Sequence, residues 1–476
     1  MQKRKWNVVV AAVLGLLHFR TRQSAREGLV LKRKWNVVVA AVLGLAAVSS
    51  GAQAQEGVTA LVNANLIDGR GNAPLANQTI LIADGRISAV FPSGSRPLQN
   101  GTRIIDLTGQ TVLPGLIEGH VHLSLNPEAA AGLRKMLRAG ITTVRDVGGD
   151  ARVTQGLRSK AAAAPNTMPD LVYSATFYGP QHLSDPRPAL VSRGLELGTA
   201  PWARAVTQDS DIAAAVGEAK ATGATGLKLY ASLGPDLLRR IVEEADRQGM
   251  KTWVHSAVFP AAVHHVVAAQ PDQIIHAKGF ITAGATDLPD NFAEGTGTWL
   301  AAQDFTGTDP NAPRFRALFA SMVAAGTIVE PALLADIDLP ERRQAPPPAA
   351  SGNSDARRQS RPAWLQHMAD WACGLTRVAH NLGVTISAGT DTNGNQPFLG
   401  RELSRLVECG LSPLDAIRAA TYNNAKAMGL EQSIGSIEEG KRADLLVLAA
   451  DPASDISRIN DVRMVMKNGT VVNIAD

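Results

Sequence analysis

The chain has 476 residues, with 47 Lys and Arg, 43 Asp and Glu, and a formal net charge of +4 at pH 7. Residues 1–54 contain nine of the basic residues and only one of the acidic residues. The rest of the chain therefore has 38 basic and 42 acidic residues. This mildly acidic remainder gives no support to nucleic-acid or membrane-surface binding. Its length, about 420 residues, exceeds the usual limit of one hydrophobic core, so we expect a large unit and a smaller one.

The N-terminal segment has the parts of a secretory leader, and it occurs twice. Residues 3–16 recur unchanged at 32–45. The second copy combines a basic start, an apolar run over 37–48 and a small-residue exit at 52–54. We interpret the first copy as a mis-set start or a cloning scar and leave residues 1–54 out of the fold. We expect a periplasmic or secreted protein that has no membrane association once the leader is removed.

The two flanks of the remaining chain have the pattern of short strands separated by turns. Asp68-Gly69, Asp84-Gly85 and Asn468-Gly469 mark such turns. The pattern predicts a small β-sandwich domain that is built from both chain ends, residues 55–111 and 430–476.

Between the flanks, short apolar runs alternate with amphipathic stretches, which is typical of parallel strands covered by helices. We expect strands near 112–120, 142–146, 171–175, 226–230, 252–255, 273–276, 327–330 and 385–388. We expect helices at 127–139, 209–222, 235–248 and 364–381. Eight strands predict an α/β fold with a (β/α)8 TIM barrel over residues 112–429. A doubly wound open sheet is the alternative, although no Gly-rich phosphate loop follows the first strand.

Metal-capable side chains recur at the ends of these strands. They are His120, His122, Lys228, His255, His276 and Asp391. In a TIM barrel the catalytic groups come from the C-terminal ends of several strands. The period of two in His120-Val-His122 directs both imidazoles to one side of a strand, where they can bind one ion. A single His is alternatively a core or surface residue, and we expect that role for His264 and His265, which fall on a predicted helix.

Lys228 requires a separate argument, because an ammonium group cannot ligate a cation. A lysine that faces a barrel interior is costly unless it is neutralised or modified. Reaction with carbon dioxide would give a carbamate, whose two oxygens can bridge two metal ions. The alternatives are a buried lysine paired with a carboxylate and a Schiff-base lysine.

Taken together, the motifs resemble the amidohydrolase superfamily over nearly the whole chain after the leader. The motifs lie at residues 114–122, 140–146, 226–230, 253–255, 275–276, 387–391 and 439–446. Within the superfamily the chain resembles the binuclear-metal branch that is related to imidazolonepropionase and includes Xaa-Pro dipeptidases, other carboxypeptidase-like enzymes and ochratoxin-type amide hydrolases. The resemblance also implies a homo-oligomer, and an octamer is one assembly that it suggests.

The resemblance implies two divalent metal ions, with zinc the expected metal. His120, His122 and Asp391 would hold one ion, His255 and His276 the other, and N6-carboxylated Lys228 would bridge them. A metal-bridging hydroxide would attack the amide carbonyl. Asp391 would take its proton and pass it to the leaving amine. Tyr230, two residues after Lys228, would polarise the carbonyl; its alternative role is that of an aromatic that fills the barrel.

One absence disfavours deamination. The resemblance implies that deaminases of the superfamily need a Glu three residues after the His of the fifth strand. In this chain the residue three positions after His255 is Val258. The chain also departs from its relatives at Glu118-Gly119, where they commonly have Asp and another small residue. This departure leaves every expected ligand in place.

We expect substrate choice to depend on two loops. Residues 177–206 follow the third strand, should cover the mouth of the site, and carry the candidate substrate residues Tyr178 and His182. Residues 339–362 carry five arginines, which suit carboxylate recognition or a solvated loop. Three aromatic residues could line an apolar pocket or pack in the core: Phe177, Trp202 and Trp299.

The expected protein is therefore a binuclear zinc amide hydrolase that acts on peptide-like or N-acyl amino acid bonds, with ochratoxin A among the candidate substrates. A cyclic amide hydrolase of the imidazolonepropionase type is the alternative enzyme. A non-catalytic scaffold on the same fold is the alternative from another class. Cys373 and Cys409 lie in neighbouring predicted helices, where they form either one disulfide or two buried thiols.

Overall fold

The computed structural model describes residues 57–336 and 363–474, which belong to one compact unit, Gly57–Asp476. The predicted leader and the arginine-rich insertion at 339–362 lie outside the described residues.

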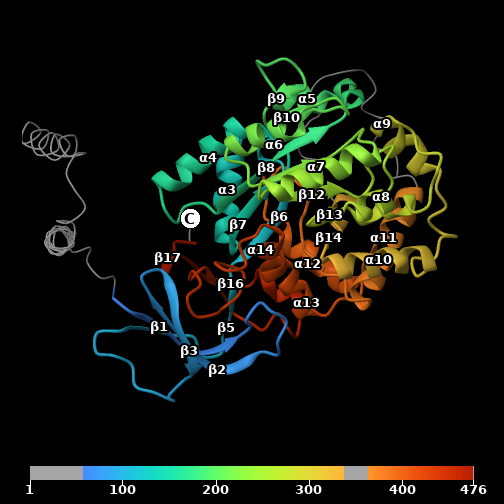
Figure 1. The fold of residues 1–476 in the computed structure, drawn as a ribbon. Helices are drawn as coiled ribbons and strands as arrows, with labels where there is room; N and C mark the ends of the chain where they lie inside the picture. The colour runs from blue at the N-terminus through green and yellow to red at the C-terminus, as the bar shows by residue number, and fades with distance from the viewer. Residues whose placement is uncertain (1–56, 337–362, 475–476) are drawn as a thin grey trace, which may run out of the picture. The chain divides into compact units, whose positions relative to one another are not determined.

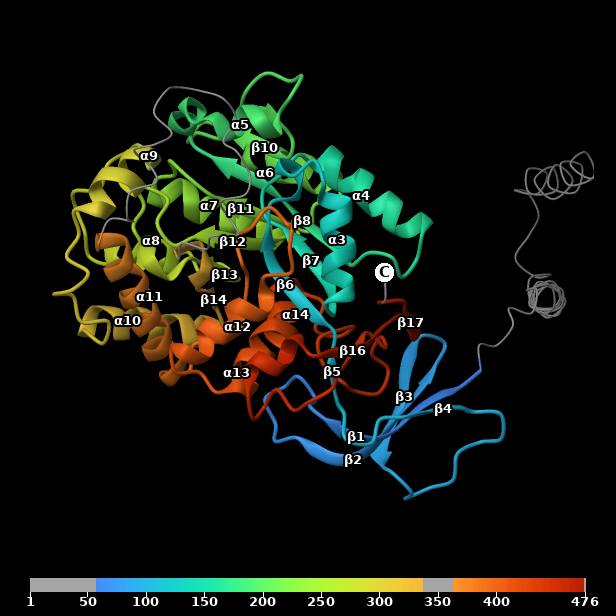
Figure 2. The same ribbon diagram turned by 180° about the vertical axis from the view of Figure 1, so that it is seen from behind.

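A parallel sheet forms the large part of this unit (Figures 1 and 2). Its barrel strands are, in order, β6 (Leu116–Val121), β7 (Ile141–Asp146), β8 (Asp170–Tyr178), β11 (Gly226–Leu229), β12 (Lys251–His255), β13 (Gln273–Ile275) and β14 (Ile328–Glu330). Two short strands extend the sheet beside β8: β10 (Ala203–Ala205), which is parallel to β8, and β9 (Thr199–Ala200), which is antiparallel to β10. The barrel strands are buried along nearly their whole length, as expected for parallel strands that are covered on both faces.

Residues 384–392 close the sheet into a barrel. They form parallel bridges to both edge strands, at Val329↔Ile386 and Val121↔Thr392. The backbone N–H of Asp391 donates to the carbonyl of His120 at 2.9 Å. The segment therefore takes the place of the eighth strand, and the predicted (β/α)8 barrel is confirmed.

Helices surround the barrel, as both ribbon views show. The main ones are α3 (Ala129–Arg138), α4 (Ala151–Ala163), α6 (Ile212–Ala221), α7 (Pro235–Arg247), α8 (Val263–Ala268), α10 (Pro313–Ala325), α11 (Ala363–Asn381), α12 (Leu399–Glu408), α13 (Pro413–Arg418) and α14 (Asn424–Ala427). In α7, Pro235 occupies the first turn, and Leu238, Ile241 and Ala245 are buried at three- and four-residue spacing. The four predicted helices are found as α3, α6, α7 and α11.

A mixed sheet contains strands from both chain ends, as predicted for the small domain. Its strands are β1 (Thr59–Leu66), β2 (Leu75–Ala83), β3 (Arg86–Pro92), β4 (Arg103–Asp106), β5 (Thr111–Pro114), β15 (Leu445–Leu448), β16 (Val462–Lys467) and β17 (Thr470–Val472). The C-terminal strand β15 runs antiparallel to β5, which pairs in parallel with β1. Leu61, Ile80, Val447 and Met466 belong to its apolar core.

The predicted first barrel strand, residues 112–120, consists of two strands that belong to different sheets. The chain changes partner at Gly115, whose N–H donates to the carbonyl of Asp444, while Leu116 donates to Gly140. A Cβ at Gly115 would lie 2.3 Å from the hydroxyl of Thr142, so only glycine fits at this crossing. Pro114 has no N–H to continue the ladder of β5.

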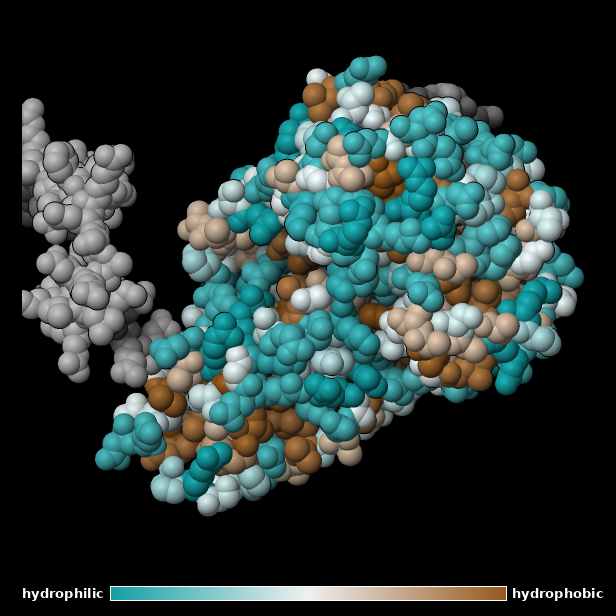
Figure 3. Space-filling view, viewed as in Figure 1, coloured by the Kyte–Doolittle hydropathy of each residue, from teal (hydrophilic) through white to brown (hydrophobic). Residues whose placement is uncertain are grey.

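A disulfide joins two of the helices around the barrel. Cys373 in α11 and Cys409 at the end of α12 form a disulfide, with their Cα atoms 5.1 Å apart. Among the described helices, none is long and apolar enough to cross a membrane. Figure 3 shows a mostly hydrophilic face with scattered apolar side chains.

Candidate metal centre

The six side chains that were predicted as metal ligands meet in one cavity of about 340 Å³. They come from four strands, β6, β11, β12 and β13, and from the closing segment 384–392. All lie at or next to the C-terminal ends of these elements, which explains why positions far apart in the sequence converge. Their roles as ligands remain a prediction, but their convergence is a feature of the structure.

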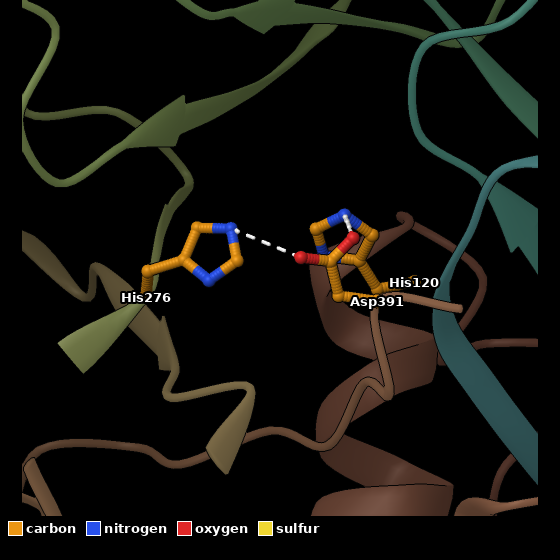
Figure 4. Close-up of side chains that lie close together, drawn as sticks. All are labelled: His120, His276 and Asp391. Atoms are coloured by element: carbon orange, nitrogen blue, oxygen red, sulfur yellow. Dashed lines mark ion pairs between the residues drawn. The ribbon is translucent and has the colours of Figure 1, made fainter. Parts of the chain in front are cut away.

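The carboxylate of Asp391 lies among three imidazoles. Figure 4 shows two of them, those of His120 and His276. Its Oδ1 is 3.0 Å from His122 Nε2 and 3.5 Å from His120 Nε2, and its Oδ2 is 3.7 Å from His276 Nε2. One ligand atom each from His120, His276 and Asp391 lies within 4.8 Å of the others. This mixed nitrogen and oxygen donor set is one that zinc and related divalent ions accept.

Three of the four imidazoles are available as ligands because burial favours their neutral form, whereas Asp391 outweighs burial at His122 and raises its pKa. Burial lowers the pKa of His120, and it lowers the pKa of His255 and His276 well below the usual value. His255 lies next to His276, with ring centroids 4.5 Å apart, and its Nδ1 is 3.2 Å from the carbonyl of Ala257. A proton on Nδ1 leaves the lone pair of His255 on Nε2, the atom that a metal would use.

Lys228 is buried in the same cavity, with 1 % of its surface exposed. Burial lowers its pKa to about 7, although Glu330 and Asp391 oppose the shift. Within residues 57–336 and 363–474, its Nζ has no hydrogen-bond partner. A buried amine without a partner is costly, and conversion to a metal-bound carbamate would remove that cost. The donor set and this orphaned amine together fit a pair of divalent cations.

The backbone is strained at two of the six positions. His276 and Asp391 have φ angles of 72° and 50°, in the left-handed region that non-glycine residues rarely adopt. Each such residue costs on the order of 1–3 kcal/mol and persists only where its surroundings enforce it. The strain turns both side chains into the cavity instead of continuing the alternation of a regular strand.

A buried ion pair supports His120 from behind. His120 Nδ1 donates to Glu330 Oε1 at 2.6 Å, and Arg145 Nη2 donates to Glu330 Oε2, also at 2.6 Å. Arg145 additionally donates to the carbonyl of Gly119 and lies over the ring of Trp253. This arrangement holds the His120 proton on Nδ1 and directs Nε2 into the cavity. The sequence indicated no such role, although Glu330 ends a predicted strand and Arg145 lies in a quoted motif.

Glu118 joins the first strand to the closing segment. Its Oε1 accepts hydrogen bonds from the backbone N–H groups of His120, at 2.9 Å, and Thr390, at 3.0 Å. Burial raises its pKa to about 8. Glu118, a position at which this chain differs from its relatives, therefore holds the backbone beside two candidate ligands, His120 and Asp391.

Tyr230 lies beside the candidate ligands, and its hydroxyl is hydrogen-bonded by Arg187 of the loop after β8. Burial raises the pKa of Tyr230 to about 12, so the hydroxyl keeps its proton at neutral pH. The ring centroid of Tyr230 is 5.4 Å from that of His255. The residue can therefore donate a hydrogen bond to a group bound at the metal ligands.

The loop after β8 covers part of the site, as predicted, through η2 (Pro180–Ser184) and α5 (Pro186–Val191). Tyr178 and His182 line a second cavity of about 240 Å³. Their rings are 5.2 Å apart, and burial lowers the pKa of His182 to about 4. The Tyr178 hydroxyl donates to the carbonyl of Ala203 at 3.0 Å, which leaves its ring as an apolar wall.

Of the two alternatives for the three aromatic residues, packing in the core is the one that the structure shows. Phe177 is fully buried in the core, the indole of Trp202 donates to the carbonyl of Val191, and Trp299 packs on Phe259. None of the three lines either cavity of the described chain. The larger cavity is instead lined by side chains that sequence reasoning missed: Lys278, Phe292, Leu300, Trp364, Leu365 and Met368.

The model of the amidohydrolase family matches residues 111–472, most of the chain. The chain belongs to the amidohydrolase family. It is 36% identical over 108 residues to imidazolonepropionase of Geobacillus thermodenitrificans, which is 21% of this chain and 25% of that relative. It is 37% identical over 105 residues to ochratoxinase of Aspergillus niger, which is 22% of each. The aligned segments thus span about a quarter of these relatives.

Solved structures extend the likeness to the whole fold. The crystal structure of A. niger ochratoxinase has a TM-score of 0.65 at 22% identity, and covers 87% of this chain and 95% of that one. That of a Xaa-Pro dipeptidase with bound methionine has a TM-score of 0.64 at 23% identity, and covers 87% and 99%. At these identities the likeness shows the fold alone.

The support of His120 by Glu330 leads to a first prediction. Glu330→Gln removes the charge that Arg145 and His120 share, so affinity for zinc should fall about 10- to 100-fold. Titration of the metal-loaded protein with a chelator measures this affinity. Glu402→Gln is the matched control: Glu402 is equally buried and accepts from the backbone N–H groups of Leu333 and Leu334. If both variants lose zinc to the same extent, the specific role of Glu330 is refuted.

Proposed function

We propose that this protein is a metal-dependent amide hydrolase that acts on peptide-like or N-acyl amino acid substrates, with two zinc ions and N6-carboxylated Lys228. The observation that carries the proposal is the convergence of four imidazoles, Asp391 and an unpartnered lysine amine on one cavity. A scaffold protein gains nothing from burying an amine without a partner beside strained ligands.

The residues would divide between the ions as the contacts indicate. His120, His122 and Asp391 would hold one ion, and His255 and His276, which are neighbours, the other. When bound, two such cations supply a nucleophile at neutral pH by making water more acidic, together with Lewis acidity toward a carbonyl oxygen.

Asp391 is placed to move the proton that amide hydrolysis transfers. Burial alone would raise the pKa of Asp391, but His120 and His122 outweigh burial and hold it well below the usual value. The carboxylate is therefore ionised and can accept a proton from the attacking water. Donation of this proton to the amine nitrogen completes the cleavage, since an amine leaves far more readily than its anion.

Tyr230 would stabilise the charge that develops on the carbonyl oxygen. Its hydroxyl is protonated, faces the larger cavity and is oriented by the hydrogen bond from Arg187. An oriented donor of this kind lowers the barrier because the oxygen becomes more negative in the transition state.

The relatives described above narrow the substrate class. They include ochratoxinase, Xaa-Pro dipeptidase and imidazolonepropionase. Open-chain amides with a free carboxylate fit the cavity better than a small cyclic amide, because about 340 Å³ with a large apolar wall exceeds what a single ring would fill.

The Lys228 carbamate provides a second prediction. The isolated wild-type protein should contain about two zinc ions per chain and release amine from dipeptides or N-acyl amino acids. Lys228→Ala should lose at least one metal ion and nearly all activity, because no anion remains to bridge the cations. Formate should restore part of both, since a small carboxylate can occupy the space of the carbamate. Lys228→Arg is the control that keeps a cationic side chain. Full activity in Lys228→Arg would refute the carbamate.

The third prediction concerns Tyr230. Tyr230→Phe should lower kcat about 100- to 1000-fold with little change in KM, because the lost hydrogen bond strengthens only in the transition state. Steady-state kinetics together with metal analysis measures the effect. Tyr178→Phe is the matched control, since its hydroxyl bonds to Ala203 away from the ligands. A kcat for Tyr230→Phe equal to that of the wild type would remove Tyr230 from the chemistry.

The fourth prediction concerns location. We propose that the protein is exported, which the leader-like segment and the Cys373–Cys409 disulfide support, because disulfides persist in oxidising compartments. In a bacterial host, the mature chain should be recovered from the periplasm with both cysteines protected from alkylation until a reductant is added. Recovery in the cytosol with two reactive thiols would contradict both points.

A further inference from the structure

A further cavity, of about 190 Å³, lies at the start of the closing segment, and we call it the α13 cavity. Residues 383–386 form one of its walls, whereas Asp391, at the other end of the closing segment, belongs to the metal centre. The remaining lining comes from the end of α11, from Leu411, from α13 and from the π-helical turn η8 (Ala419–Asn423). The α13 cavity shares no residue with the two cavities at the candidate ligands.

Two opposite charges line the α13 cavity without pairing with each other. Asp415 and Arg418 are three residues apart in α13, so both project from the same side of this helix. This spacing ordinarily brings opposite charges together, but within the described residues Asp415 pairs with His380, whose Nε2 lies 3.4 Å from Asp415 Oδ2. Both charged side chains face the cavity instead of each other.

Arg418 is a half-buried cation without a partner. Its guanidinium forms no hydrogen bond or ion pair within residues 57–336 and 363–474, and its Nε is also shielded from solvent. The side chain packs against the turn between β1 and β2, because a Cβ at Gly71 would lie 3.3 Å from Arg418 Cδ. A donor that has lost hydration and gained no partner is costly, so an acceptor in the cavity would stabilise it.

The acceptors of the α13 cavity are also incompletely used. The hydroxyl of Ser412 donates to Asp415 Oδ2 at 2.5 Å, but no hydrogen bond from the described part of the chain reaches Asp415 Oδ1. The Nδ2 of Asn423 donates to the carbonyl of Ile386 at 2.7 Å, whereas its Oδ1 is buried without a partner. A ligand with N–H donors would satisfy these oxygens.

The rest of the lining is mostly apolar, and the cavity is small. Val384, Ile386 and Leu411 are nearly fully buried. Gly383 beside them is exposed, so the cavity is open to solvent at this residue. A volume of about 190 Å³ lies below the roughly 300–1000 Å³ of sites for drug-sized ligands, which restricts the ligand to a small molecule.

The two charges decide the class of ligand. A simple anion would pair with Arg418 but would be repelled by Asp415, and a simple cation would meet the opposite situation. A purely apolar molecule would displace water and leave both charges unpaired. A molecule that carries an anion and a cation a few atoms apart, together with a small aliphatic group, matches every part of the lining.

We propose that the α13 cavity binds a free aliphatic α-amino acid, with its carboxylate on Arg418, its ammonium group toward Asp415 and its side chain against the apolar wall. The planar fork of a guanidinium suits a carboxylate. This inference goes beyond the proposed function and does not rest on it, because no residue of the metal centre takes part.

Calorimetry with L-leucine on the metal-loaded protein tests the two charges. Arg418→Met and Asp415→Asn should each weaken leucine binding at least about tenfold, as expected for the loss of a hydrogen bond between charged groups. Arg377→Met and Asp370→Asn are the matched controls, since both residues are exposed on α11 outside the lining, and they should bind leucine as the wild type does. Asp415→Asn keeps the shape of its side chain and remains informative if Arg418→Met does not fold.

Analogues of leucine test whether one ligand uses both charges. 4-Methylpentanoate lacks the amino group, and 3-methylbutylamine lacks the carboxylate. Each should bind at least about tenfold more weakly than leucine to the wild type, because each leaves one charge of the cavity unpaired. Glycine should also bind more weakly, since it leaves the apolar wall uncovered. Equal affinity for 4-methylpentanoate and leucine would overturn the assignment to an amino acid.

The metal centre is a second place at which an amino acid can bind, and Lys228→Ala separates the two places. Leucine binding in the α13 cavity should persist unchanged in Lys228→Ala, because the two sites share no residue. Leucine binding that is lost in Lys228→Ala but unchanged in Arg418→Met would overturn the proposal, as would no binding to the wild type at millimolar leucine. Amide hydrolysis without leucine binding refutes this inference alone, and leucine binding at Arg418 without amide hydrolysis refutes only the proposed function.

Discussion

The closing segment 384–392 is the constraint on which the site depends. It bridges β14 and β6, completes the barrel, and ends in Asp391, whose backbone N–H donates to His120. Close approach is possible because Gly389 has no side chain: a Cβ there would lie 2.7 Å from both His120 and Glu330. Barrel closure and ligand placement are therefore one event, and any change that opens the barrel at this seam separates Asp391 from the imidazoles.

The charges behind the ligands explain how such a site can stay folded. Arg145 and Glu330 are fully buried, and an isolated buried charge would cost several kcal/mol. They are paired with each other, and Glu330 also accepts a hydrogen bond from His120 Nδ1. Breaking this pair leaves a buried charge uncompensated, so the support of His120 is as much a requirement of folding as of metal binding. The strain at His276 and Asp391 is tolerated for the same reason, since rigid surroundings enforce it.

The barrel and the convergence of the six candidate ligands followed from the sequence because both depend on local patterns. Strand and helix periodicity fixes the order of elements, and the C-terminal end of each strand is recognisable from where its apolar run stops. The split at Gly115, the pairing of Glu330 with Arg145, and the walls of the cavities depend on which distant segments touch. Phe177 lies in β8 and fills the core, whereas Phe292 lies in the segment between β13 and β14 and lines the cavity. The local sequence gives the type of each side chain but not the distant segments that it meets.

The division into two cavities separates the part of the site that performs chemistry from the parts that choose the substrate. The residues that line both cavities are His122, Lys228, Tyr230, Asp391 and Arg187. The first four lie at strand ends or in the closing segment, which the barrel holds in place, whereas Arg187 lies in the loop after β8. The unshared walls come from loops and from α11, which can change without moving a ligand. The Cys373–Cys409 disulfide ties α11 to α12 five residues beyond Met368, so the α11 wall of the larger cavity is anchored covalently. Substrate preference in this chain should therefore depend on helix and loop packing, while the strand ends set the reaction.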